Sequence, residues 1–258
     1  MMFTKAITRK PCRTLINGIS TAQFGEGTPD YELALEQHAK YVQTLESLGL
    51  TVTVLEGDDR FPDSCFVEDP AVVMQECAVI TNPARESRNG EKVEMLEVIR
   101  RFYRDDQIFS IEAPGTMEGG DVMLVDKHFY VGLSDRTNEE GAAQFAKIVG
   151  RFGYAVTTVP VTEGLHLKDF AVYLENNNLF VTETMNAAPA FADFHRIVIP
   201  AEELYAINSL NINGTVMVPK GYPKTLQIIE DLGYPTKLVD TSEFRKIDGS
   251  LTCLSLRF

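Results

Sequence analysis

The chain has 258 residues, of which 44% are hydrophobic and 24% are charged, and this balance can form the core of one large domain or of two small ones. Its 24 Lys and Arg against 37 Asp and Glu give a formal net charge of −13 without any basic cluster, which excludes nucleic acid as a partner. The N-terminal residues lack the apolar stretch of a signal peptide, and no run approaches the ~18 apolar residues of a membrane span. We therefore expect a soluble, cytoplasmic protein that does not engage a membrane.

Helical periodicity occurs four times along the chain. In each case apolar residues recur at spacings of three and four, and the run ends near a glycine. The predicted helices cover 30–48, 91–103, 138–152 and 224–232, and a β-like run follows each of them, at 51–55, 106–111, 154–159 and 235–239.

Pairs of short apolar runs joined by tight turns predict β-hairpins between these helices. The clearest pairs 208–212 with 215–218, because Asn213-Gly214 is the favoured sequence of a two-residue hairpin turn. The others pair 71–74 with 77–80, 122–125 with 128–131, and 171–174 with 179–181.

Together these elements form a module of strand, turn, hairpin and helix that recurs about every 40 to 55 residues, a spacing typical of radial or stacked repeats. A fifth copy can be assembled from 252–258 and 3–8. Pairing these two terminal segments would close a ring and remove exposed sheet edges. The alternative is an α+β sheet in which the regularity arose by chance.

The turns that precede the hairpins carry the residues with chemical potential. Acidic residues occupy 63–69 and 118–121, a histidine opens the turn 166–169, and the turn 247–250 precedes Cys253. In a ring of modules these turns meet at one end and supply a thiol, a base and an acid, as nucleophilic catalysis requires. Taken alone, each has a structural reading: Cys253 lies in a strand-like stretch, and a buried cysteine often only packs.

Two of these acids suggest the kind of substrate. Asp63 and Asp69 bracket the turn 63–69 without neighbouring residues of metal-ligand type. Clustered carboxylates can bind a planar, delocalised cation by paired hydrogen bonds, and guanidinium is the natural match. Solvated turn acids remain the alternative. The cysteines at 12, 65, 77 and 253 form no CxxC pair and no cluster with histidine, so we expect no structural metal, no disulfide framework and a reducing compartment.

Four motifs in this order resemble the bacterial type of the dimethylarginine dimethylaminohydrolase family. They are FPDSCFVED at 61–69, IEAPGTMEGGD at 111–121, LHLK at 165–168, and VDTSEFRKIDG at 239–249 followed by Cys253. The likeness extends along the whole chain. It implies the five-bladed α/β-propeller of the guanidine-modifying (pentein) superfamily, built as one domain over 1–258 from ββαβ modules and closed by pairing of its N- and C-terminal strands.

The resemblance also implies a reaction, the hydrolysis of Nω-methylated arginine to citrulline and an alkylamine, without metal or organic cofactor. It assigns Cys253 as the nucleophile, His166 as the general acid and base, and Glu118 as the acid that orients His166. By the same resemblance, Asp69 holds the guanidinium, and Phe66 and Glu68 lie beside it. At the other end of the substrate, Asp63 meets the α-amino group, and Arg88 and Arg136 hold the α-carboxylate. Ile19, from a lid at 18–25, and Ile247 also contact the substrate.

Asp169 departs from the family pattern, which has a small hydroxyl residue at this position. Related arginine deiminases carry an aspartate two residues after the histidine, where this chain has Lys168. Asp169 either adds an acceptor that favours a less methylated guanidine or points away from the substrate. Arginine itself is therefore the rival substrate, and a propeller that binds a macromolecule without catalysis is the rival from another class. The oligomeric state stays open, a homodimer included.

Overall fold

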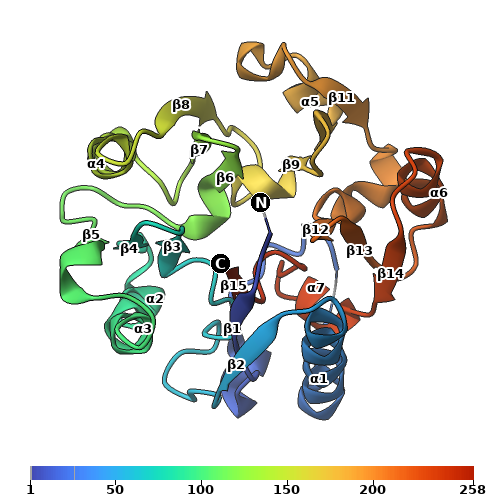
Figure 1. The fold of residues 1–258 in the computed structure, drawn as a ribbon. Helices are drawn as coiled ribbons and strands as arrows, with labels where there is room; N and C mark the ends of the chain where they lie inside the picture. The colour runs from blue at the N-terminus through green and yellow to red at the C-terminus, as the bar shows by residue number, and fades with distance from the viewer. Residues whose placement is uncertain (1, 26) are drawn as a thin grey trace.

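The computed structural model describes residues 2–25 and 27–258. Its named strands form five three-stranded sheets with one shared topology, in which the central strand pairs antiparallel with one neighbour and parallel with the other. Figure 1 shows the sheets gathered around a common centre with the longer helices outside. The sheets consist of β15 (Leu256–Arg257), β1 (Lys5–Arg9) and β2 (Thr51–Leu55); β3 (Ala71–Val73), β4 (Ala78–Ile80) and β5 (Ile108–Ser110); β6 (Val122–Val125), β7 (His128–Leu133) and β8 (Ala155–Pro160); β9 (Ala171–Tyr173), β10 (Asn178–Val181) and β11 (His195–Val198); and β12 (Leu210–Ile212), β13 (Thr215–Pro219) and β14 (Thr236–Val239).

A helical connection joins the central strand of each sheet to its parallel neighbour. The four predicted helices are confirmed as α1, α3, α4 and α6. Asp30 caps α1 by accepting a hydrogen bond of 2.9 Å from Leu33 N, and Asn138 caps α4 by accepting one of 2.8 Å from Gly141 N. The helices are α1 (Tyr31–Ser47), α2 (Glu86–Asn89), α3 (Glu91–Ile99), α4 (Glu139–Gly150), α5 (Glu183–Asn186), α6 (Pro223–Asp231) and α7 (Ser242–Arg245).

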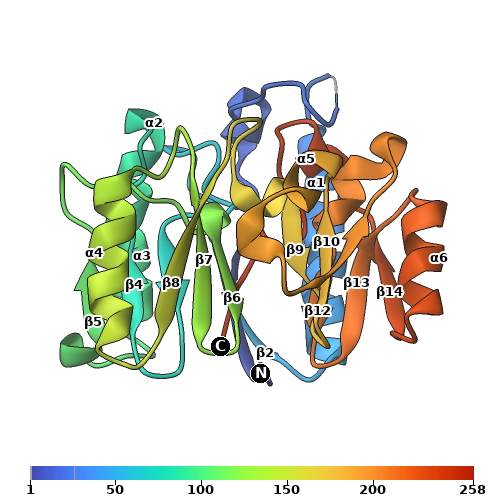
Figure 2. The same ribbon diagram turned by 90° about the horizontal axis from the view of Figure 1, so that it is seen from above.

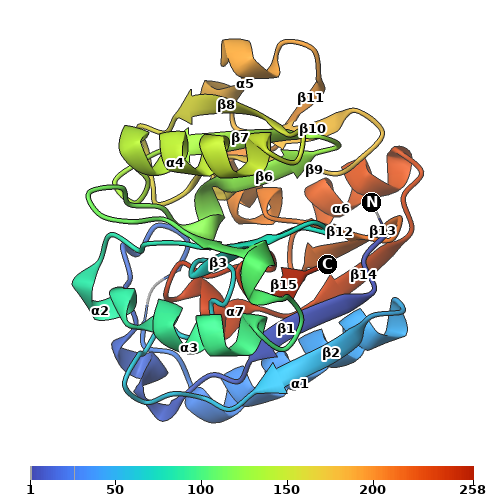
Figure 3. The same ribbon diagram turned by 60° about the vertical axis from the view of Figure 1, so that its left-hand side comes forward.

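The apolar core lies largely between each helical layer and its sheet. On α4, Phe145 and Val149 pack against Phe129 and Val131 of β7, and the rings of Phe129 and Phe145 meet edge to face with 5.0 Å between their centroids. Figure 3 shows the same arrangement in two modules, with α1 along β2 and α4 along β7 and β8. Helices that bury one face in this way leave the turns at the strand ends free to carry function.

The predicted pairing of the terminal segments is confirmed, since β1 pairs antiparallel with β15 through Ala6–Arg257 and Ile7–Leu256. Figure 2 shows both termini at one end of the molecule, and α2 and the early loop drawn in blue at the other end. The residues just before β15 are thereby fixed in space by the first strand of the chain.

Four local predictions were wrong. The strand predicted at 106–111 begins as a 3₁₀ turn at Asp105–Gln107, and β5 starts only at Ile108. The second helix ends at Ile99 rather than at position 103. The strand β11 was missed, because the short α5 before it has no long periodic pattern. Finally, Cys253 lies in a turn rather than a strand, since only Leu256 and Arg257 pair with β1.

Candidate active site

A small pocket of about 30 Å³ collects the turns at one end of the molecule. Nine of the twelve site residues predicted from the sequence line it, while Glu118, Glu68 and Asp169 do not. Three further residues, Leu165, Asp248 and Gly249, complete the wall. The lining residues predicted from the sequence are Ile19, Asp63, Phe66, Asp69, Arg88, Arg136, His166, Ile247 and Cys253.

His166 lies between two carboxylates. Its Nε2 is 2.8 Å from Oε2 of Glu118, which is fully buried, and 3.8 Å from Oδ1 of Asp69. Burial by itself lowers the pKa of His166, but the charge of Asp69 and the hydrogen bond with Glu118 outweigh it and raise this pKa to about 10. The imidazole is therefore protonated at neutral pH and can donate a proton.

The two glycines after Glu118 make this approach sterically feasible. A Cβ on Gly120 would lie 2.5 Å from Nδ1 of His166, and a Cβ on Gly119 would lie 1.9 Å from the carbonyl oxygen of Glu68. Neither position has room for a side chain, so the Gly-Gly pair brings two backbones and an imidazole into contact.

Cys253 is buried in the turn that precedes β15, where its amide donates to Ser250 O at 3.2 Å and its carbonyl accepts from Glu68 N at 3.2 Å. Burial raises the pKa of the Cys253 thiol well above its usual value, and the charges of Glu68 and Asp69 raise it further. The thiol is therefore neutral in this state, and a positive charge brought into the pocket would favour the thiolate.

Asp69 is ionised and firmly held. Its Oδ2 accepts a 2.6 Å bond from Nη1 of Arg88, and its Oδ1 accepts from Gly120 N at 3.0 Å. Burial alone would raise the pKa of Asp69, but the charges of His166 and Arg88 prevail and lower it to about 2. A buried carboxylate of this kind can attract a guanidinium to the mouth of Cys253.

The two arginines in the wall already have acidic partners. Arg88, on α2, also donates to Glu91 at 2.9 and 2.8 Å, and Nη1 of Arg136 lies 3.3 Å from both oxygens of Glu118. Nε of Arg136 is a buried donor that lacks a protein partner in the described part of the chain.

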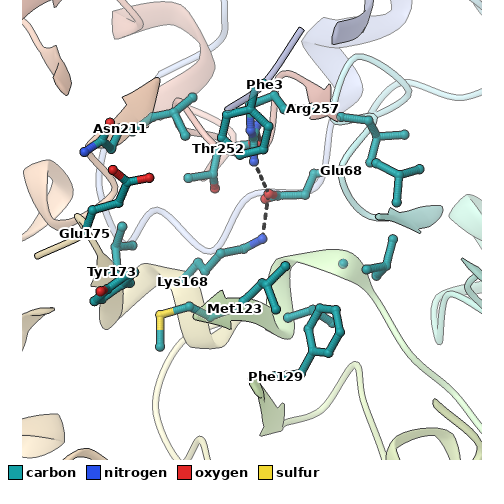
Figure 4. A pocket seen from close by; sticks show the side chains of 18 of the residues that line it. Phe3, Glu68, Met123, Phe129, Lys168, Tyr173, Glu175, Asn211, Thr252 and Arg257 are labelled. Carbon is teal, nitrogen blue, oxygen red and sulfur yellow. Dashed lines mark hydrogen bonds and ion pairs between the residues drawn. The ribbon is translucent and has the colours of Figure 1, made fainter. Parts of the chain in front are cut away.

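Glu68, predicted to lie beside the guanidinium, and Asp169, predicted either to add an acceptor or to point away from the substrate, have other contacts. Oε1 of Glu68 accepts from Lys168 at 2.6 Å and from Arg257 at 3.0 Å, inside a separate cavity of about 430 Å³ that Figure 4 shows. Oδ2 of Asp169 accepts from His166 N at 3.1 Å, and burial raises the pKa of Asp169 to about 7. Asp169 thus supports the backbone of His166 rather than the pocket wall.

Asp69, Glu118 and His166 are the one group among the described residues whose donor atoms could hold a metal ion, with these atoms within 4.8 Å of one another. Their charges are already balanced by Arg88, Arg136 and the protonated imidazole. The donor set therefore suits an ion-pair network better than a metal. In the described ranges, no helix has the length and apolar character needed to cross a bilayer.

Sequence reasoning from the chain alone did not single out Asp248 or the second cavity. A signal for Asp248 was present, because the turn 247–250 was recognised as equivalent to the acidic turns. The cavity gave no such signal, since its wall combines residues from all five sheets or the turns beside them.

The chain is similar to known proteins along its whole length. The model of the family described as eukaryotic N,N dimethylarginine dimethylhydrolase matches residues 19–192. N(G),N(G)-dimethylarginine dimethylaminohydrolase of Pseudomonas aeruginosa is 47% identical over 257 residues, covering 100% of both chains, and that of Streptomyces coelicolor is 35% identical over 253 residues, covering 98% of this chain and 96% of the other.

Solved structures agree with this relationship. A cysteine-to-serine mutant of the Pseudomonas aeruginosa enzyme, complexed with citrulline, is 46% identical, covers 100% of both chains and has a TM-score of 0.96. The N-terminal domain of ArgZ, an arginine dihydrolase from cyanobacteria, shares the fold with a TM-score of 0.83 at 17% identity, over 98% of this chain and 97% of that one. On these grounds, the chain belongs to the dimethylarginine dimethylaminohydrolase family.

Proposed function

We propose that this protein hydrolyses Nω-methylated arginine to citrulline and dimethylamine or methylamine through a covalent intermediate on Cys253. The observation that carries the proposal is the pocket itself, in which Cys253, Asp69 and a protonated His166 meet. The name and the citrulline complex of the Pseudomonas aeruginosa relative support the choice of substrate.

The first half of the reaction begins with charge pairing. The guanidinium enters beside Asp69 and favours ionisation of the thiol of Cys253, whose proton passes to solvent because His166 is already protonated. The thiolate attacks the guanidinium carbon and gives a tetrahedral adduct. His166 donates its proton to the alkylated nitrogen, the carbon–nitrogen bond breaks, and the amine leaves a cationic thiouronium on Cys253.

The second half returns the enzyme to its starting state. His166, now neutral, takes a proton from water as the oxygen attacks the thiouronium carbon. The carbon–sulfur bond then breaks and the thiolate of Cys253 departs. The hydroxyl proton passes to this thiolate, which restores the thiol and leaves the urea group of citrulline. Glu118 holds the imidazole in place through both steps, because its hydrogen bond of 2.8 Å stabilises the protonated form.

We assign the far end of the substrate to Asp63, Arg88 and Arg136, place Phe66 beside the guanidinium, and expect Ile19 and Ile247 to contact the substrate. All six line the pocket. Because Asp169 bonds to the backbone of His166 and does not line the pocket, it gives the guanidinium no extra acceptor. That supports a methylated arginine over arginine itself.

We also propose that residues 1–258 form one domain, a five-bladed α/β-propeller, and that the enzyme acts in the cytoplasm on a small guanidine. Five sheets of the same topology around a common centre support the propeller. The cysteines at 12, 65, 77 and 253 are all free, which suits a reducing compartment.

A citrulline assay on arginine, monomethylarginine and asymmetric dimethylarginine tests the function. We expect citrulline from the methylated substrates, none from Cys253→Ser, and normal rates from Cys12→Ser, a matched change at a buried cysteine outside the pocket. A wild-type protein that forms no citrulline from any of the three refutes the proposal. Citrulline formation by Cys253→Ser refutes the choice of nucleophile.

A further inference from the structure

The loop Gly18–Gly25, called the lid loop here, is fastened to the pocket by two aspartates. Ile19 N donates to Oδ1 of Asp63 at 3.0 Å. Thr21 donates twice to Oδ2 of Asp248, from its backbone N at 2.5 Å and from its hydroxyl at 2.8 Å. Both aspartates line the pocket, so the two residues that bind the lid loop also border the substrate site.

Asp248 has one oxygen in use and one without a partner. Oδ2 accepts both bonds from Thr21, whereas Oδ1 is buried and has no hydrogen-bond partner in the described residues. The whole residue is only 6% exposed, and its backbone adopts a φ of +57° between Ile247 and Gly249 of the pocket wall. A buried acceptor left without a donor costs about 1–3 kcal/mol, so a ligand that supplies the donor at this place would be stabilised.

The chemistry of this end of the pocket indicates what the ligand is. Asp63 and Asp248 bring two carboxyl groups to one wall, and burial raises the pKa of Asp63, as expected where a cation is still to be bound. A primary ammonium has three N–H donors and can serve two carboxylates at once. The guanidinium end of the substrate is assigned to Asp69, so the α-ammonium is the cation that remains.

We propose, on the basis of the function proposed above, that Asp248 is a positioning and specificity residue for the substrate's α-ammonium group. Its Oδ1 accepts a hydrogen bond from the ammonium while its Oδ2 holds the lid loop at Thr21. Substrate binding and lid position are then coupled through a single carboxylate. A guanidine that lacks the α-amino group would leave Oδ1 unpaired and would be selected against.

The test compares two substrates and three variants. The substrates are asymmetric dimethylarginine and its analogue with hydrogen in place of the α-amino group. Asp248→Asn keeps the shape and removes the charge, and Thr21→Val removes one bond to the lid loop, with Thr21→Ser as its rescue. Asp59→Asn is the matched control, because Asp59 also accepts two backbone N–H bonds, from Arg13 and Thr14, but lies outside the pocket.

Kinetics read out the ammonium contact. In Asp248→Asn, KM for dimethylarginine should rise by about tenfold or more, the effect of losing a hydrogen bond between charged groups. KM for the analogue should rise no more than it does in Thr21→Val, and Thr21→Ser and Asp59→Asn should match the wild type on both substrates. An equal rise in KM for both substrates in Asp248→Asn overturns the ammonium contact.

Hydrogen exchange of the lid-loop amides tests the hydrogen bonds between Thr21 and Asp248 without any turnover. Exchange should be faster in Asp248→Asn and in Thr21→Val than in wild type, Thr21→Ser and Asp59→Asn. Unchanged exchange in Asp248→Asn overturns the claim that Asp248 holds the lid loop, whether or not the protein is active. Failure of the proposed function would give a different result from both of these, namely a wild-type protein that forms no citrulline.

Discussion

The hydrogen bond between Glu118 and His166 gives a prediction that can be measured on the free enzyme. Glu118→Gln preserves the shape of the side chain but removes the negative charge that lies 2.8 Å from Nε2 of His166. A hydrogen bond to a charged group contributes about 1.5–3 kcal/mol, and one pKa unit corresponds to about 1.4 kcal/mol. The pKa of His166, raised to about 10 in the native protein, should therefore fall by about one to two units.

NMR titration of the labelled imidazole measures this shift directly. The alkaline limb of kcat/KM, which reports the same group in the free enzyme, should move to lower pH by the same amount. Glu112→Gln is the matched control, because Glu112 is exposed and precedes the same hairpin. If the pKa of His166 in Glu118→Gln stays within about half a unit of the wild-type value, the charge of Glu118 is not what keeps the imidazole protonated.

Three further predictions concern the surroundings of His166. Burial raises the pKa of Asp169 from 3.8 to about 7, so the folded state binds the proton more tightly than the unfolded state does. The free energy of unfolding should therefore fall as pH rises through this interval. Urea titrations of Asp169→Asn should show no such fall. In Asp169→Thr, the ratio of methylated to free arginine turnover should change by less than about threefold, and a larger rise would restore a direct role in substrate choice. In Gly120→Ala the new Cβ would lie 2.5 Å from Nδ1 of His166, so kcat/KM should fall by about 100-fold. Gly150→Ala is the control and should leave kcat/KM unchanged, because its Cβ would have no atom within 4 Å. Equal activity in the two variants would contradict the packing argument.

The repeated architecture could be predicted because the same local sequence patterns recur in separate modules. The periodic patterns of α1, α3, α4 and α6 and the hairpin turns between them are local properties of the sequence. The strand β11 escaped because its connection from β10 has only the four-residue α5 and a 3₁₀ turn, too short for a helical period. Its register is set by pairing with β10, which is a tertiary contact that no local pattern contains.

The pocket residues could be named, but their partners could not. The resemblance indicates that Arg88 and Glu118 matter. The salt bridges Arg88–Asp69 and Arg136–Glu118, however, each join two distant turns or loops of one module and depend on side-chain directions. Neighbouring residues also turn to opposite sides: Asp69 lines the pocket, whereas Glu68 lines the large cavity with Lys168. The resemblance therefore identified Glu68 as a neighbour of the substrate. It did not indicate the ion pairs in which one of the carboxylate oxygens of Glu68 takes part.

The pairing of β1 with β15 has a consequence for folding. The turn that contains Cys253 is held by a contact between residues about as far apart in the chain as any two can be, and closing so large a loop carries the greatest entropic cost of any pairing in the protein. We expect the sheets made of sequence neighbours to form before it. During refolding, recovery of thiol reactivity should lag behind recovery of secondary structure, so that Cys253 becomes competent only in a chain whose architecture is otherwise complete.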